Sequence, residues 1–316
     1  MRRLIKNIFL LFTIVLFIAF VSYRINVWSI NKAGLQLCDS TETLMTGSSL
    51  IMLGLNPEYI PKSENVASAA EPVVISYFKI RDIIGNNPQV KRVITSCSLH
   101  EITEQDVVFS GKRSVVVEMF TRLSFLRNSV TLDDLKLFKV DYPVYWEVFT
   151  RYRVFPNYFY IYRALFENNL KCNYDGLLYV SGFQKRGDFN IRADVREDVD
   201  VVKVVNAHFP SKGMQKKLSN VSLNYLDSIS ALCDRSNIEL IIVGMPISEK
   251  LYEKIPRFYI NYYNSYVDKM KQRLKCRFFD FTHAAKEEWF LDLIHLDELG
   301  AEKITTMLND SIKNDK

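Results

Sequence analysis

Short apolar runs alternate with longer stretches of helical periodicity in two parts of this 316-residue chain. The short runs predict buried β-strands at residues 43–46, 93–95, 238–243 and 277–281, with a further candidate at residues 114–117. The longer stretches predict helices at residues 73–84, 214–236, 252–274 and 298–312, the last with Asp297 as its N-cap. Strands that alternate with helices in this way are typical of a parallel sheet with crossover helices. The pattern therefore predicts an α/β fold.

The alternation stops between about residues 120 and 210, where Tyr, Phe and Arg are frequent. Arg151, Arg153 and the tyrosines near them are suited to contacts with sugar faces and anionic groups. Aromatic residues in an insertion more often simply pack against each other. We therefore predict that this segment is an insertion, or a lid, over the sheet.

The first 24 residues have a different pattern from the rest. Residues 7–23 form a run of 17 residues without a charge, and roughly 17–25 apolar residues are needed to span a bilayer as a helix. Arg2, Arg3 and Lys6 precede the run, so the positive-inside rule keeps the N-terminus in the cytoplasm. We predict a cytoplasmic tip and single-pass anchor at residues 1–24, a stalk at 25–40 and an extracytoplasmic domain at 41–316. The alternative is a cleaved signal peptide, but the run lacks a small-residue cleavage site.

Composition narrows the classes of function. The net charge of +5 is small and no basic stripe with interleaved aromatic residues is present, so nucleic-acid binding is not expected. The five cysteines include no C-x-x-C pair, so a zinc site is not expected either. Cys97, Cys233 and Cys276 lie in or beside apolar runs and are predicted to be mostly buried free thiols. A disulfide is possible if the domain lies outside the cytoplasm, but the spacing of the cysteines does not show which residues would pair.

Two short motifs at opposite ends of the domain carry the candidate chemistry. A Gly-Ser-Ser-Leu motif at residues 47–50 places Ser49 at the end of the first predicted strand. An Asp-Leu-Ile-His motif supplies Asp292 and His295, which one tight turn would hold together. A serine hydroxyl becomes a nucleophile when an imidazole takes its proton, and a carboxylate fixes the tautomer of that imidazole. The three residues are therefore predicted to form a serine-hydrolase triad at one edge of the sheet.

Other assignments stay open at this point. Ser48 is the reactive hydroxyl if the register differs by one residue. His283, beside Asp280, is a second candidate base. Cys97 and His100 resemble a thiol–imidazole pair, although no third, orienting group is evident. Gly-Ser-Ser is also a common turn sequence without any chemistry.

With these motifs in this order, the chain resembles the SGNH (GDSL-type) hydrolase superfamily. It is similar in particular to the membrane-anchored members that O-acylate or deacylate polysaccharides in bacterial envelopes. The matching residues are the Gly-x-Ser that ends in Ser49, and Asp292-x-x-His295 with a Gly300-Ala301 that opens the last helix. The resemblance implies a three-layer α/β/α fold with a flavodoxin-like parallel sheet. It also implies Ser49 as nucleophile, His295 as base and Asp292 as the acid that orients it.

The resemblance further implies an oxyanion hole with three donors: the N–H of the nucleophile, a glycine of a second block and an asparagine of a third. The second block here, residues 65–70, has no glycine, so the backbone N–H groups of Ser68 and Ala69 are the expected substitutes. The third block, residues 96–101, has no asparagine, and His100 is the candidate donor. Because the loss of one donor costs on the order of 100–1,000-fold in rate, these departures leave a non-catalytic role open.

Together, the resemblance and the predicted topology imply a periplasmic domain anchored in the inner membrane. Its expected activity is that of a serine-dependent esterase or O-acyltransferase acting on acyl esters of a cell-envelope glycan. A membrane partner that supplies acyl groups is expected, since the domain has no route to cytoplasmic donors. The chemistry requires no metal and no organic cofactor. The alternative is a non-catalytic protein that keeps the SGNH scaffold to bind a glycan or an envelope assembly partner.

Overall fold

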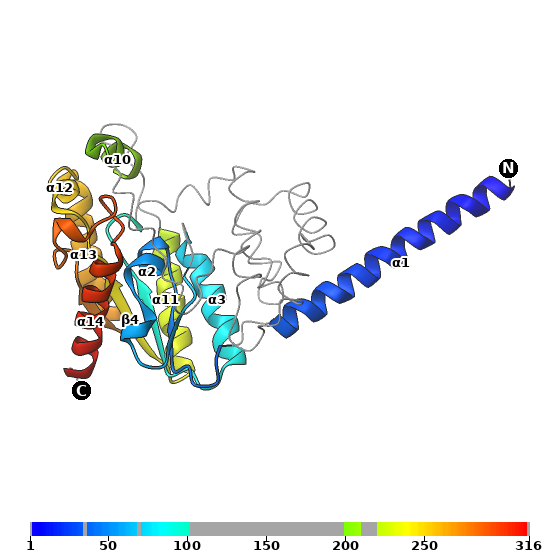
Figure 1. Ribbon diagram of the computed structural model, residues 1–316, viewed down its shortest axis with the longest axis horizontal. Coiled ribbons are helices and arrows are strands. Elements are labelled where there is room, and N and C mark those ends of the chain that lie inside the picture. The colour runs from blue at the N-terminus through cyan, green and yellow to red at the C-terminus, as the bar shows by residue number, and fades with distance from the viewer. Residues whose placement is uncertain (1, 34–36, 68–70, 102–198, 210–219, 315–316) are drawn as a thin grey trace.

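The computed structural model describes residues 2–33, 37–67, 71–101, 199–209 and 220–314. Within these ranges the chain forms an α/β fold around a five-stranded sheet whose strands are all parallel, in the order β2-β1-β3-β4-β5 (Figure 1). The strands are β1 (Thr43–Met45), β2 (Ser63–Asn65), β3 (Arg92–Ser96), β4 (Glu239–Gly244) and β5 (Arg277–Asp280). The predicted parallel sheet is confirmed, and the four strands expected from apolar runs lie side by side.

The strands at the centre of the sheet are buried. Every residue of β1 is buried, and so are all residues of β3 and β4 except the first of each. Strands covered on both faces read as continuous apolar runs, which explains why the sequence revealed β1, β3 and β4. The edge strand β2 was not predicted, because its sequence, Ser-Glu-Asn, contains no apolar residue.

Several helices that follow the strands flank the sheet. These are α2 (Ser49–Gly54), α3 (Val73–Asn86), α11 (Asn220–Arg235), α13 (Arg257–Arg273) and α14 (Glu298–Asn314). Helix α2 packs against α14, and α3 packs against α11 (Figure 1). Helix α11 is joined to α13 by an ion pair of 2.6 Å between Asp227 and Arg273. Parallel strands of one sheet need crossover connections, which are usually α-helices.

Shorter elements complete the described part of the chain. They are the helices α10 (Val201–His208) and α12 (Glu249–Tyr252) and the 3-10 turns η1 (Pro57–Tyr59) and η5 (Glu287–Trp289). The helix expected at residues 252–274 begins only at Arg257, as α13, and Tyr252 is the last residue of the separate helix α12. Proline fixes its own φ and disfavours helical backbone in the residue before it. A helix therefore begins after Pro256 and does not run through it.

The other predicted helices are confirmed where the structure describes them, and the first residues of the helix predicted at 214–236 lie outside the described residues. Helix α3 ends at Asn86, and α14 starts at Glu298 as expected. The side chain of Asp297 accepts a hydrogen bond of 2.7 Å from the N–H of Gly300, which is the predicted N-cap contact. The strand candidate at residues 114–117 lies outside the described residues. So does nearly all of the predicted insertion, of which the structure describes only residues 199–209.

Helix α1 (Arg2–Ala33) precedes the sheet and extends away from it (Figure 1). Its large apolar side chains between Leu4 and Val21 are exposed wherever the structure describes them. Among the described residues, however, no helix is both long and apolar enough to cross a membrane. The membrane-spanning role of residues 7–23 therefore stays a prediction. Within the predicted stalk, α1 continues to Ala33, and the N–H of Leu37 already donates to Asn87 of the domain.

Candidate active site

The nucleophile candidate lies where β1 turns into α2. Gly47 adopts a φ of +149°, a conformation that L side chains rarely adopt, and a Cβ there would lie 2.9 Å from Cγ1 of Ile51. Ser48 caps α2, because its Oγ accepts a hydrogen bond of 3.3 Å from the N–H of Leu50. Ser49 is the first residue of α2 and is half-buried. The chain thus turns sharply just before Ser49 and presents it at the carboxyl edge of the sheet.

The acid and the base lie in one tight turn after β5. Oδ1 of Asp292 accepts hydrogen bonds from two backbone N–H groups, that of Ile294 at 2.6 Å and that of His295 at 2.7 Å. The N–H of Leu291 donates to the carbonyl of His295 at 2.8 Å and closes the turn. Leu293 and Ile294 are buried, so the apolar residues between the acid and the base anchor the turn in the core.

The fold brings the three predicted catalytic side chains into one chain of hydrogen bonds. Nε2 of His295 lies 2.9 Å from Oγ of Ser49, across 246 residues of sequence. Nδ1 of His295 lies 2.7 Å from Oδ2 of Asp292. Both distances are within ordinary hydrogen-bond range. The predicted proximity of Ser49, Asp292 and His295 is therefore confirmed, and each ring nitrogen of the histidine faces the partner that a serine triad requires.

The surroundings of Asp292 favour its charged form. Burial by itself raises the pKa of Asp292, but the side-chain hydrogen bond and charge of His295 lower it, as do the two backbone N–H groups. Together these lowering effects outweigh burial, so the pKa of Asp292 lies below its ordinary value. An ionised Asp292 accepts a hydrogen bond from Nδ1–H and leaves Nε2 free to accept the proton of Ser49.

We expect Asp292→Asn to impair the turnover of an acyl ester severely, by about 10⁴-fold, because an amide does not hold the tautomer in which Nε2 of His295 faces Ser49 as an acceptor.

The same variant also tests the lowered pKa of Asp292. A carboxyl with a lowered folded-state pKa stabilises the fold at pH values above its unfolded pKa, and this contribution is lost as pH falls through the folded pKa. Near neutral pH, wild type should therefore unfold at a higher temperature than Asp292→Asn, and this difference should shrink below about pH 4. A constant difference down to about pH 2 would contradict this account.

The alternative reactive groups have other partners in the fold. Oγ of Ser48 donates to Oε1 of Glu101 at 2.6 Å, whereas Ser49 is the serine that contacts His295. Nδ1 of His283 lies 2.5 Å from Oε1 of Glu249. Asp280 accepts instead from the hydroxyl of Thr282 at 2.6 Å. The geometry therefore favours Ser49 over Ser48 and does not join His283 to Asp280.

The cysteines within the described residues divide into two groups. Cys38 is disulfide-bonded, and Cys97, Cys233 and Cys276 are free, as predicted for these three. Burial raises the pKa of Cys97 well above its ordinary range, and the nearby charge of Glu101 adds to this. Because the thiolate is the nucleophilic form of cysteine, this environment does not suit Cys97 to the role of a nucleophile paired with His100.

The oxyanion candidates are only partly described. Ser68 and Ala69 lie outside the described residues. His100 is buried in the loop after β3, and its ring centroid lies 6.0 Å from that of His208. Its role as a donor stays a prediction.

Two buried residues near the site were missed from the sequence. Nδ2 of Asn65 donates to the carbonyls of Ile51 and Leu55, at 2.8 and 2.9 Å, and so ties α2 to the end of β2. Glu101 accepts hydrogen bonds from Ser48, in the turn before Ser49, and from Ser96 at the end of β3. Neither has a sequence signal of its own, and only burial, at 3% and 7% exposure, marks these polar residues as structurally important.

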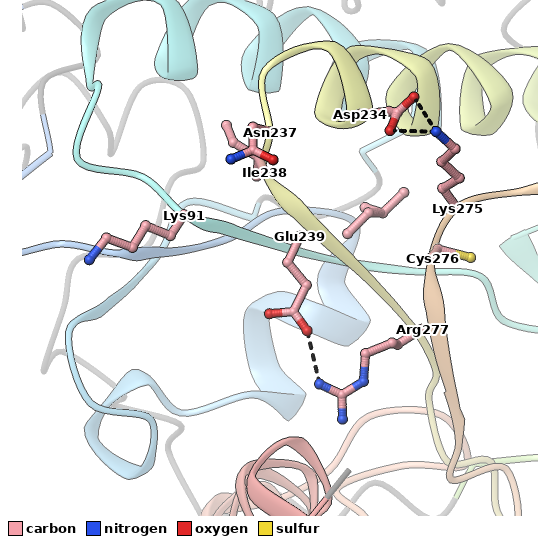
Figure 2. A pocket seen from close by; sticks show the side chains of 9 residues that line it. Lys91, Asp234, Asn237, Ile238, Glu239, Lys275, Cys276 and Arg277 are labelled. Carbon is pink, nitrogen blue, oxygen red and sulfur yellow. Dashed lines mark hydrogen bonds and ion pairs between the residues drawn. The ribbon is translucent and has the colours of Figure 1, made fainter. Parts of the chain in front are cut away.

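A pocket of about 550 Å³ lies at the opposite edge of the sheet. Its charged side chains come from the amino ends of β4 and β5 and their neighbours, and four of them form two ion pairs with one another (Figure 2). Lys275 contacts Asp234 at 3.0 Å, and Arg277 contacts Glu239 at 2.8 Å. The pocket lies at the amino ends of the strands, whereas Ser49 and His295 follow the carboxyl ends of β1 and β5. The pocket is therefore separate from the candidate active site.

Comparison with known proteins adds one match. No curated protein matches the sequence. The model of an uncharacterised family matches residues 148–316, which is more than half of the chain. The matched region contains Asp292 and His295 and begins after Ser49. The chain therefore belongs to this uncharacterised family.

Proposed function

We propose that the domain is an SGNH-type serine hydrolase, an esterase or O-acyltransferase that acts on acyl esters of a cell-envelope glycan. The observation that carries the proposal is the hydrogen-bonded chain Ser49–His295–Asp292, with distances of 2.9 and 2.7 Å. The strand order β2-β1-β3-β4-β5 is that of flavodoxin-like sheets, which supports a three-layer α/β/α fold. The positions of Ser49 after β1 and of the Asp-x-x-His turn after β5 support the resemblance to this superfamily.

The chemistry follows from these positions. Oγ of Ser49 attacks the acyl carbonyl while Nε2 of His295 takes the hydroxyl proton. The tetrahedral oxyanion that forms is stabilised by the N–H of Ser49, at the start of α2, and by the backbone N–H groups of Ser68 and Ala69. The C–O bond to the glycan then breaks, and the leaving alkoxide takes the proton from His295. Asp292 holds the imidazole and stabilises its charged form throughout.

The second half of the reaction reverses the first. Water or a sugar hydroxyl gives its proton to Nε2 of His295 and attacks the acyl group on Ser49. Collapse of the second intermediate returns the proton to Oγ and releases an acid or a new ester. Hydrolysis and transfer thus use the same three side chains and differ only in the acceptor. A membrane partner that delivers acyl groups would favour transfer.

We further propose that α1 anchors the domain in the inner membrane, with residues 25–316 in the periplasm. The support is the exposed apolar side chains of α1, preceded by Arg2, Arg3 and Lys6. The disulfide at Cys38 also fits an oxidising compartment. Protease added to spheroplasts should digest the domain. Complete protection would contradict this topology, and a mature N-terminus near residue 24 would show that the anchor is cleaved.

A non-catalytic scaffold is the second candidate. It is favoured by the missing asparagine in the loop after β3, which the family uses as an oxyanion donor. In that loop Oγ of Ser98 instead accepts a hydrogen bond of 3.0 Å from the N–H of Met245. Such a protein would keep the fold to bind a glycan or an assembly partner, and it would not form a covalent intermediate.

Treatment of the purified protein with a fluorophosphonate, a serine-directed probe, distinguishes the two candidates. The enzyme reacts at Ser49, and peptide mapping should find the adduct on the peptide that contains this residue. Ser49→Ala should abolish labelling, and Ser48→Ala is the matched control that should retain it. Absence of labelling in folded wild-type protein would favour the scaffold, and labelling at another serine would contradict the assignment of Ser49 as the nucleophile.

A further inference from the structure

Glu101 is a buried carboxylate next to the turn that carries Ser49, and it is 7% exposed. Its Oε1 accepts two hydrogen bonds, from Oγ of Ser48 at 2.6 Å and from Oγ of Ser96 at 2.7 Å. Its Oε2 accepts a third, from the N–H of Ser98 at 2.8 Å. The three donors belong to the start of α2, the end of β3 and the loop after β3. One side chain therefore connects the carboxyl ends of two neighbouring strands.

One contact of Glu101 is with the residue just before the nucleophile. Ser48 donates to Glu101 and at the same time accepts from the N–H of Leu50, so it links the carboxylate to the first turn of α2. On the other side, a Cβ at Gly47 would lie 3.1 Å from Oγ of Ser96. The backbone before Ser49 is thus packed directly on Ser96, which Glu101 also holds. Glu101 therefore holds Ser48 directly, and it holds Ser96, the residue against which Gly47 lies.

We propose that Glu101 is a positioning residue for the nucleophile. Acting through Ser48 and Ser96, it fixes the backbone before Ser49 so that Oγ stays in line with Nε2 of His295. The inference rests on the proposed function, since it assigns a role in the same site. Glu101 need not touch the substrate, because a displacement of about 1 Å in a reacting group lowers a rate by about 100-fold.

The isosteric variant Glu101→Gln tests this role. An amide has one acceptor oxygen and one donor group, so it cannot accept hydrogen bonds on both sides as the carboxylate does. We expect kcat for p-nitrophenyl acetate to fall about 10- to 100-fold, with KM within about twofold of wild type, because the lost restraint acts on the reaction and not on binding. The rate of fluorophosphonate labelling at Ser49 should fall in parallel.

Glu64→Gln is the matched control. Glu64 is also buried, at 5% exposure, and accepts hydrogen bonds from the N–H of Cys38, at 2.7 Å, and from the hydroxyl of Thr41. Both partners precede β1, away from the carboxyl edge where Ser49 lies. Glu64→Gln should leave kcat and KM within about twofold of wild type, even if it lowers the unfolding temperature. An equal loss of kcat in both variants would overturn the proposal, because any buried carboxylate would then have the same effect.

A double variant tests the route through Ser48. If Glu101 acts through that hydroxyl, the loss in Ser48→Ala/Glu101→Gln is smaller than the product of the two single losses. Single losses that multiply fully would contradict the route, and wild-type kcat in folded Glu101→Gln would overturn the whole inference. Ser49→Ala in the same series separates the two ideas. If Ser49→Ala is inactive while Glu101→Gln is unaffected, only the positioning role is wrong; if Ser49→Ala is fully active, the proposed function is wrong.

Discussion

Ser49→Ala should abolish ester cleavage and acyl transfer while leaving the fold intact. The change removes one half-buried oxygen whose partner is Nε2 of His295 at 2.9 Å. His295→Ala should lose nearly as much, because residues that act as one unit are not additive, and the loss in such triads is about 10⁶-fold in kcat. Turnover of p-nitrophenyl acetate and the acylation state of the native glycan in cells are the two measurements.

Ser48→Ala is the control for this prediction. Its hydroxyl contacts Glu101 and not His295, so the variant should retain much more activity than Ser49→Ala. The double variant Ser49→Ala/His295→Ala should be no worse than either single one. Should Ser49→Ala match wild type in both assays, the catalytic proposal is wrong and the scaffold role replaces it.

Lys79→Met should strongly destabilise the fold, because it breaks a buried ion pair. Nζ of Lys79 lies 2.6 Å from Oε2 of Glu71, and the two side chains are only 2% and 0% exposed. Lys79 also donates to the carbonyl of Val66, and Glu71 accepts from the hydroxyl of Ser76 at 2.7 Å. Removing the cation leaves a buried carboxylate without its counter-charge, which costs about 3–5 kcal/mol in the free energy of unfolding. Urea denaturation followed by circular dichroism measures this.

Two comparisons make the result specific to the buried pair. Replacing both partners, in Lys79→Met/Glu71→Leu, should restore part of the stability, because no charge then remains buried. Lys275→Met removes an exposed pair with Asp234, in which the lysine side chain is 77% exposed, and should cost less than about 1 kcal/mol. A Lys79→Met protein as stable as Lys275→Met would show that the buried pair contributes little.

Much of the fold could be predicted because its signals are local. β4 is a run of apolar residues long enough to be recognised alone, and α14 has both its periodicity and its cap at Asp297. The exceptions are one strand formed through a distant partner and one helix interrupted by a local residue. β2 has no apolar residue and becomes a strand only because β1 offers it an edge on which to pair. The break before α13 depends on Pro256, whose effect on backbone geometry competes with the helical pattern around it.

The candidate site divides in the same way. The sequence by itself determined the turn of Asp292 and His295, because the carboxylate meets the N–H groups two and three residues further along the chain. It could suggest Ser49 but not place it, since 246 residues separate Ser49 from His295. Only the tertiary structure decided that contact, through a parallel sheet that gathers the carboxyl ends of its strands at one edge. Glu101 and Lys79 became visible for the same reason: a charged side chain has no sequence pattern that reveals its burial, and burial depends on elements that pack around it from distant parts of the chain.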